Sequence, residues 1–226
     1  MKQKENMTIA IDGPAGSGKS TVAKIIAKNL KFRFLDTGAI YRAVALKSII
    51  ERISSKDERA LAEMMDKTKI ILENIEDETK VLLDNKDVSK EIRTEAVSEA
   101  SSAVAVHPEV RKRVKIIQRD FASKGNTVCE GRDMGAEVFP EAKYKFYLDA
   151  SVEERAKRRY KEYLKIDEEI NIEKIKEDIE FRDKQDSTRK ASPLRKAKDA
   201  IVVDTTNLNI QEVVEVILSI IREKQA

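Results

Sequence analysis

The sequence predicts an α/β fold in which about five parallel strands lie between layers of helices. Three observations support this prediction. Short apolar runs of strand length alternate with segments of helical periodicity along the 226 residues. A glycine-rich turn joins the first apolar run to the first helical segment, and apolar residues recur at helical spacing from Ile210 to Ile221. Strands that alternate with helices favour a doubly wound parallel sheet, which binds ligands beyond the carboxyl ends of its strands.

Each expected strand is a short apolar run, and each expected helix has apolar residues every three or four positions. Ser151 with Glu154 also forms a capping box for one helix. The expected strands are 7–11, 32–35, 127–129, 144–148 and 200–203, and the expected helices are 19–30, 39–51, 57–67, 94–106, 109–122, 152–164, 172–186 and 210–221.

One segment breaks the alternation of strands and helices. The runs 70–72 and 81–83 flank the acidic stretch 76–78 and predict an antiparallel hairpin, which indicates an inserted subdomain. We therefore expect a single unit over 1–226, with a core of 7–67 and 107–226 and an insert of 68–106. The basic stretch 154–166, which contains Arg155, Arg158 and Arg159, is either a solvated helix face or a mobile lid, and we favour the lid.

The composition excludes several classes of protein. Lys and Arg number 44 against 41 Asp and Glu, so the net charge of +3 does not indicate a nucleic-acid-binding surface. The one cysteine, Cys129, cannot form an internal disulfide and lies in an apolar run. The N-terminal residues lack the apolar region of a signal peptide, and no apolar run approaches the ~20 residues that span a bilayer. We expect a cytoplasmic monomer without nucleic-acid or membrane partners.

The glycine-rich turn Gly13-Pro14-Ala15-Gly16-Ser17-Gly18-Lys19-Ser20 has the spelling of a phosphate-binding P-loop. Its glycines allow a tight turn in which backbone N–H groups face one concavity, and the following helix adds partial positive charge there. Lys19 can reach the β- and γ-phosphates, and the Ser20 hydroxyl can coordinate Mg²⁺. A chance glycine-rich turn is the alternative, but the strand before it and the helix after it favour a nucleoside triphosphate site.

The P-loop alone does not identify the class of protein. A GTPase would carry Asp three residues before a glycine, and no Asp has this position relative to any of the seven glycines. The guanine-like string Asn85-Lys86-Asp87-Val88 has the wrong order. Motors and helicases usually carry an apolar strand that ends in Asp, whereas the third expected strand here ends in Glu130-Gly131-Arg132-Asp133. Switch and motor functions are therefore disfavoured.

Several arginines follow the expected strands or lie on facing helices. Arg42 follows the second strand and Arg132 the third, and Arg182 and Arg189 share a helix face if that helix continues. Each one taken singly is more often a surface ion pair. Guanidinium groups bind phosphate oxygens in pairs, so together these arginines favour transfer between two phosphate-bearing substrates.

These residues resemble those of bacterial-type cytidylate kinases, and the resemblance covers about 7–222. The P-loop is shared by many families, whereas the segments around Arg42 and Arg132 are more selective. Thr37 stands where a Ser is common. The matching strings besides the P-loop are Leu35-Asp36-Thr37-Gly38-Ala39-Ile40-Tyr41-Arg42, Glu91-Ile92-Arg93-Thr94, Glu130-Gly131-Arg132-Asp133-Met134-Gly135, Val138-Phe139-Pro140, Leu148-Asp149-Ala150-Ser151 and Arg182-Asp183.

The resemblance implies transfer of the γ-phosphoryl group of ATP, with Mg²⁺, to CMP or dCMP. It implies that the insert binds the monophosphate and that the lid closes over the ATP phosphates. The implied catalytic residues are Lys19, Arg132, Arg158 and Arg189. The implied ATP-binding residues are Asp12, Gly13, Pro14, Ala15, Gly16, Ser17, Gly18, Lys19, Ser20, Thr21 and Arg158, with Ser20 on the metal. The implied acceptor-binding residues are Thr37, Tyr41, Arg42, Ser102, Arg111, Arg132, Asp133, Arg182, Asp186 and Arg189.

Within that set, Ser102, Arg111 and Asp133 look like the residues that read cytosine. A carboxylate accepts the exocyclic amine of cytosine, and Arg or Ser donates to its N3 and O2. Three alternatives stay open. Ser102 is a small packing residue, or Asp133 only orients Arg132 as an ion pair, or the acceptor is UMP, AMP or another phosphate. A P-loop binding or switch protein without a second substrate is the remaining class.

Overall fold

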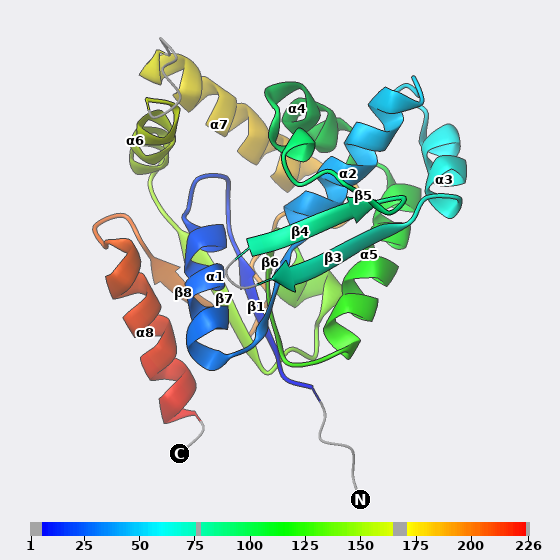
Figure 1. Ribbon diagram of the computed structural model, residues 1–226. Helices are drawn as coiled ribbons and strands as arrows, with labels where there is room; N and C mark the ends of the chain where they lie inside the picture. Colours follow the sequence, from blue (N-terminus) through cyan, green and yellow to red (C-terminus); the bar gives the residue numbers. More distant parts are fainter. Residues whose placement is uncertain (1–5, 76–77, 165–170, 225–226) are drawn as a thin grey trace, which may run out of the picture.

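The computed structural model describes residues 6–75, 78–164 and 171–224. A five-stranded sheet in the order β2-β6-β1-β7-β8 forms its centre, and every neighbouring pair is parallel (Figure 1). The predicted fold class is therefore confirmed. The strands are β1 (Thr8–Asp12), β2 (Arg33–Asp36), β6 (Thr127–Gly131), β7 (Tyr144–Asp149) and β8 (Ile201–Asp204).

Helices pack on both faces of this sheet because its central strand is apolar on both sides. Along β1, Ala10 faces one hydrophobic core and Ile9 and Ile11 face the other. The helices α1 (Lys19–Leu30) and α8 (Ile210–Glu223) contribute to the core with Ile9. The core with Ala10 is shared by α2 (Thr37–Ile50), α3 (Glu58–Asp66) and α5 (Pro108–Ser123).

The expected hairpin is present and belongs to a three-stranded antiparallel sheet of β3 (Ile70–Ile75), β4 (Glu78–Leu83) and β5 (Lys86–Asp87). The third strand was not expected, because it is only two residues long. Asp84 and Asn85 connect it to β4 with positive φ angles of 49° and 68°, a backbone that suits a two-residue hairpin turn. Residues 76 and 77 of the expected acidic stretch lie outside the described residues.

The chain after this small sheet leads back to the main core. A 3₁₀ turn over Glu91–Arg93 precedes α4 (Glu95–Val104), which begins and ends inside the expected helix 94–106. Val81, Ile92 and Val97 of this region are buried in the same core as Ile40 of α2. The segment 68–106 is therefore continuous with one face of the main sheet.

Two helices above the strands form a third, smaller hydrophobic cluster. Among the described residues it contains buried Ala156 of α6 (Val152–Tyr163) together with Ile175 and Ile179 of α7 (Ile172–Thr188). The pair lies over the end of the sheet at which α1 begins (Figure 1). Residues 165 and 166 of the expected lid lie outside the described residues.

The prediction that Arg182 and Arg189 share one face of a continuing helix is wrong. The helix α7 ends at Thr188, and Arg189 has the extended angles φ −60° and ψ 141°. The next residues turn back, and Leu194 donates its N–H to the carbonyl oxygen of Asp186 at 2.7 Å. Within the described part of the chain, the helices are too short or too polar to cross a membrane.

Candidate active site

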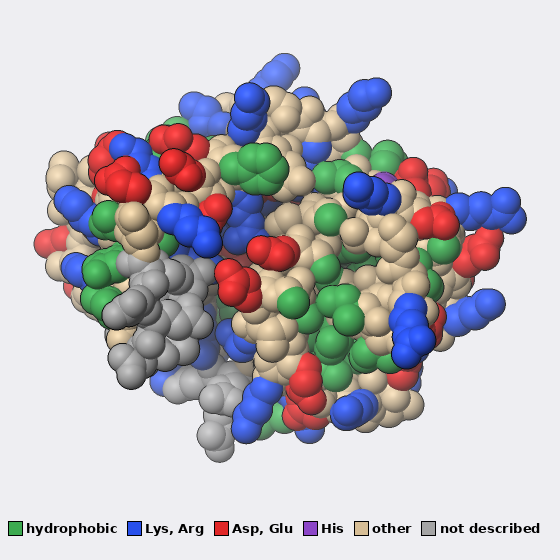
Figure 2. All heavy atoms as spheres, turned by 90° about the horizontal axis from the view of Figure 1, so that it is seen from above, with side chains coloured by type: hydrophobic (Ala, Val, Ile, Leu, Met, Phe, Trp, Pro, Cys, Tyr) green, Lys and Arg blue, Asp and Glu red, His purple; other side chains and the backbone are tan. Residues whose placement is uncertain are grey.

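A cavity of about 650 Å³ lies at the carboxyl ends of β1, β2 and β6. Seen from above, Lys and Arg side chains lie deep in a recess of the surface (Figure 2). The recess is bounded by the P-loop, by α2, α4 and α5, and by the facing helices α6 and α7. The predicted site residues that line it are Ala15, Gly16, Gly18, Lys19, Ser20, Thr21, Thr37, Tyr41, Arg42, Ser102, Arg111, Arg132, Asp133, Arg158, Arg182, Asp186 and Arg189.

The remaining predicted residues, Asp12, Gly13, Pro14 and Ser17, are not among those that line the cavity. Gly13 has a steric role, because a Cβ atom there would lie 2.2 Å from the carbonyl oxygen of Leu148. A side chain at this position would push the P-loop away from β7. The loop thus needs glycine where the two backbones meet.

The P-loop turns into α1 at Gly18, whose φ of 83° lies in the left-handed region. Lys19 follows at the start of the helix and is only 6% exposed. Its Nζ atom donates to the carbonyl oxygen of Pro14 at 3.1 Å, so the ammonium folds back over the loop. Burial, and then the charge of Arg132, lower the pKa of Lys19 to about 8, although Glu130 opposes them. The site therefore holds a cation that lacks full solvation.

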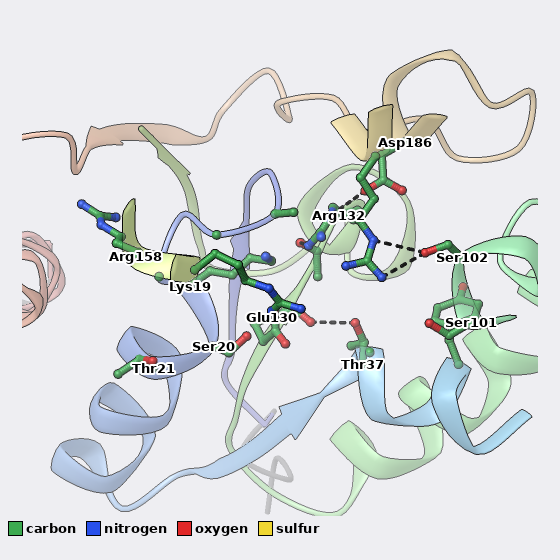
Figure 3. A pocket seen from close by; sticks show the side chains of 18 of the residues that line it. Lys19, Ser20, Thr21, Thr37, Ser101, Ser102, Glu130, Arg132, Arg158 and Asp186 are labelled. Atoms are coloured by element: carbon green, nitrogen blue, oxygen red, sulfur yellow. Dashed lines mark hydrogen bonds and ion pairs between the residues drawn. The ribbon is translucent and has the colours of Figure 1, made fainter. Parts of the chain in front are cut away.

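Glu130 is a lining residue that was not predicted as a site residue. It lies at the end of β6, is 5% exposed, and accepts a hydrogen bond from the side chain of Ser20. Burial raises the pKa of this carboxyl, while Lys19 opposes the change. Figure 3 shows Lys19, Ser20 and Glu130 close together in the middle of the cavity. The position of Glu130 at the end of a strand, close to Arg132 in the sequence, was the signal that could have identified it as a site residue.

Ser20 and Glu130 together suit Mg²⁺. A hydroxyl and a carboxylate supply the oxygen ligands that this ion prefers, and nucleotide phosphates and water commonly complete its shell. Within 6–75, 78–164 and 171–224, no group of three or more His, Cys, Asp or Glu side chains could hold a metal by itself. The protein thus offers a partial ligand set that a bound triphosphate would complete.

On the side of the cavity away from the P-loop, the central residue is Asp133. Its Oδ2 atom accepts from Nη2 of Arg111 at 2.6 Å, and its Oδ1 atom lies 3.9 Å from Nη2 of Arg189. The guanidinium of Arg111 lies 5.4 Å from the centre of the Tyr41 ring. All three charged side chains are 5–7% exposed. Because buried charges are costly unless they are paired, the mutual pairing of these side chains indicates a specific, preorganised binding site.

Arg132 has a different partner from its neighbour Asp133. Its Nε atom donates to Asp186 at 2.8 Å, and Asp186 also accepts from Arg189 at 3.2 Å. Burial would raise the pKa of Asp186, but Arg132 and Arg189 outweigh it and hold the pKa below its usual value. The alternative in which Asp133 only orients Arg132 is therefore not what this structure contains.

Three arginines of this side keep N–H groups without a hydrogen-bond partner. Nε of Arg42, Nε of Arg111 and Nη2 of Arg189 are buried donors that make no hydrogen bond with the described residues. Buried donors are nearly always paired in folded proteins. An anionic ligand or the acceptor edge of a base would supply the missing acceptors.

Ser102 connects two walls of the cavity on the side of Asp133. Its Oγ atom accepts from Nε and Nη2 of Arg182, each at 3.2 Å, and this bridge joins α4 to α7 (Figure 3). Nη2 of Arg182 also donates to the carbonyl oxygen of Ser98 at 3.2 Å. Ser102 is thus hydrogen-bonded across the cavity, in contrast to the alternative of a simple packing residue. Ser101, which also lines the cavity, was missed because nothing separates it from other small helical residues.

The arginines of the expected lid differ in their surroundings. Arg155 is 4% exposed and donates to the carbonyl oxygens of Ala150 and Ala15 at 3.0 Å and to Asp183 at 2.6 Å. It does not line the cavity, whereas Arg158 and Arg159 do. Arg158 donates to the carbonyl oxygen of Thr205 at 2.5 Å and to that of Ser17 at 3.4 Å, so it lies at the P-loop end of the cavity. The basic stretch therefore contains one buried structural arginine, Arg155, and two arginines that reach the cavity, Arg158 and Arg159.

The comparison with known protein families decides the class. The family model for cytidylate kinase matches residues 9–223. The chain belongs to the cytidylate kinase family. It is 49% identical to the cytidylate kinase of Carboxydothermus hydrogenoformans over 218 residues, which is 96% of this chain and 98% of the relative. It is 46% identical to that of Bacillus subtilis, over 97% of this chain and 98% of the relative. The cytidylate kinase of Pediococcus pentosaceus is 50% identical, over 94% of each chain.

Proposed function

We propose that this cavity transfers the γ-phosphoryl group of ATP to CMP or dCMP, with ADP and CDP or dCDP as products. One observation carries the assignment to this cavity. A P-loop with a buried lysine and an arginine cluster around Asp133 line the same recess. Membership in the cytidylate kinase family supports the choice of acceptor. An oxygen of the acceptor phosphate attacks the γ-phosphorus, and the bond from that phosphorus to the β–γ bridging oxygen breaks.

The donor triphosphate lies along the P-loop in this proposal. Backbone N–H groups of 15–20 bind its phosphates, and Lys19 turns from Pro14 to the β- and γ-oxygens. Ser20, with Glu130, would hold Mg²⁺, which when bound neutralises the charge that develops on these oxygens. Arg158, at the same end of the cavity, would close over the phosphates and exclude water.

The acceptor lies between α2, α4 and α7. Arg42, Arg132 and Arg189 hold its phosphate, and Arg182 with Asp186 holds the ribose. The unpartnered N–H groups of Arg42 and Arg189 support this placement, because they need acceptors. Thr37 and Tyr41 lie on the α2 side of the same recess.

The base is read by Asp133, Arg111 and Ser102. The Asp133 carboxylate accepts the amine of cytosine, whereas uracil carries an oxygen at that position and would face a negative charge. Arg111, whose Nε atom lacks a partner, donates to the acceptor side of the ring. Specificity for cytosine would thus come from a charge that repels the wrong base.

The chemical step relies on positioning and charge. Phosphoryl transfer has a loose transition state that asks for little covalent chemistry from the protein. The charge on the oxygens of the phosphoryl group during transfer would be stabilised by Lys19, Arg132, Arg158 and Arg189. The segment 68–106 would bind the monophosphate, and 154–166 would act as the lid. We further propose a monomer that works in the cytoplasm, where the free thiol of Cys129 is compatible with reducing conditions.

A coupled assay of ADP release tests the proposal with purified enzyme, ATP, Mg²⁺ and a panel of CMP, dCMP, UMP and AMP. We expect CMP and dCMP to give the highest kcat/KM values. A higher value for UMP or AMP would favour the kinase of another acceptor. Calorimetry with CMP alone separates the remaining alternative, since a P-loop binding protein without a second substrate has no reason to bind CMP.

A further inference from the structure

We propose that Asp12 is a positioning residue of the acceptor site, although it lies on the donor strand. Its carboxylate holds the loop that carries Arg132 and Asp133 by accepting two backbone N–H groups of that loop. This inference rests on the proposed roles of Arg132 and Asp133 in binding CMP. It differs from the sequence-based prediction, in which Asp12 contacts ATP.

The geometry at Asp12 is that of a dedicated anchor. Oδ1 accepts from the N–H of Met134 and Oδ2 from the N–H of Gly135, each at 2.8 Å. The residue is 3% exposed and does not line the cavity. Both carboxylate oxygens are thus used inside the protein, by residues that follow Arg132 and Asp133 directly.

The anchored segment is unusual backbone that needs such support. Met134–Val138 forms a single π-helical turn, in which the N–H of Val138 donates to the carbonyl oxygen of Asp133 at 3.2 Å. The first N–H groups of any helical turn have no partner within it. Asp12 supplies two acceptors at this point, so the turn can start directly after Asp133.

The anchor also determines where the side chains before the turn lie. Arg132 reaches Asp186 at 2.8 Å and Asp133 reaches Arg111 at 2.6 Å, which requires a defined path for their backbone. Asp12 directly precedes Gly13, so the same residue ends the strand that carries the P-loop. One carboxylate therefore sets the spacing between the phosphate-binding loop and the loop that reads the acceptor.

The test compares Asp12→Asn with the wild-type enzyme in steady-state assays. Asn has almost the same shape, but its amide NH₂ replaces one acceptor and opposes a backbone N–H. We expect the KM for CMP to rise by about tenfold or more, as for the loss of a hydrogen bond to a charged group. The preference for CMP over UMP should fall, and the KM for ATP should stay within about twofold of the wild-type value, since a few tenths of a kcal/mol changes a constant by less than that.

Asp149→Asn is the matched control. Asp149 ends the neighbouring strand β7 and also accepts a backbone N–H, from Ala150 at 2.9 Å, but it is exposed and does not contact the acceptor loop. Both KM values should remain unchanged in this variant. Equal effects of Asp12→Asn on the two KM values, or no effect on the KM for CMP, would overturn the inference.

Two further measurements separate the possible failures. If Asp133→Ala raises the KM for CMP and Asp12→Asn does not, the inference fails and the proposed function stands. If neither variant changes the KM for CMP, the proposed acceptor site fails.

If Asp12→Asn does not fold, amide hydrogen exchange of the wild-type enzyme tests the inference. The N–H groups of Met134 and Gly135 must then exchange as slowly as those of β6. Exchange at the rate of exposed loops would reject the anchor.

Discussion

The donor and acceptor ends of the cavity are built in contrasting ways. The donor end is built on one short continuous segment, the P-loop and the start of α1, of which Ala15, Gly16 and 18–21 line the cavity, and it offers backbone N–H groups and one lysine. The acceptor end gathers side chains from α2, α4, α5, the loop after β6 and the end of α7. In the proposed function, a triphosphate would be recognised at the donor end by its charge and shape, whereas a base would be recognised at the acceptor end through a few aligned charges. The contrast indicates that substitutions should affect the two substrates separately.

The strongest test of the donor end is Lys19→Met. We expect kcat to fall by about 10³-fold or more, because the loss of one transition-state donor commonly costs 10²–10³-fold and Lys19 carries a full charge. The melting temperature should not fall, since a buried ammonium with a pKa lowered to about 8 is not favourable to the fold. Lys24→Met, at an exposed position of the same helix, is the control and should retain activity. Retained turnover in Lys19→Met would remove this residue from the chemistry.

The matching test of the acceptor end is Asp133→Ala. We expect the KM for CMP to rise about 100-fold, because Arg111 and Arg189 lose their shared counter-charge and the cytosine amine loses its acceptor. The KM for ATP should change by less than about threefold. Removal of one member of a buried ion pair also costs roughly 3–5 kcal/mol of stability, so thermal melting must accompany the kinetics. A similar rise in both KM values would contradict the separation of the two ends.

A third test uses pH at the donor end. The pKa of Lys19 lies at about 8 in the free enzyme, so the ammonium is mostly charged at pH 7 and mostly neutral at pH 9. Phosphates favour the charged form, and the dissociation constant of ATP should therefore rise about tenfold between these pH values. Calorimetry in buffers of different ionisation enthalpy should show proton uptake at pH 9. The same titration of Lys19→Met should lack this change, and an unchanged ATP affinity in the wild type would reject the lowered pKa.

The sequence predicted the sheet and the P-loop because their signals are local. The apolar run 7–11 and the glycine spacing that follows it specify a strand, a turn and a helix within a few residues. The resemblance to a known family supplied the acceptor residues, and the structure brings Arg42, Arg111 and Asp133 into one cavity. Their proposed contacts with CMP remain predictions.

Contacts between distant residues could not be predicted. Asp12 lies 122 residues before Met134, and no pattern in the sequence links them. Arg155 and Arg158 lie about one turn apart on the same face of α6, and both donate to carbonyl oxygens of the P-loop. Only Arg155 is paired with Asp183 of α7 and buried, whereas Arg158 lines the cavity, and no local pattern in the sequence separates the two. Arg189 was misplaced because the end of α7 at Thr188 depends on the turn that follows and has no clear stop signal of its own.

The small cluster between α6 and α7 has a consequence for engineering. Among the described residues, Ala156, Ile175 and Ile179 are buried there in a cluster separate from both cores of the sheet. Exchange of this helical pair for that of a relative would therefore leave the two hydrophobic cores of the sheet unchanged, whereas the polar contacts from Arg155 to Ala15 and from Asp186 to Arg132 would have to be kept. A chimaera that keeps these contacts and the bridge from Arg182 to Ser102 would therefore test the proposed lid apart from the proposed base-reading residues.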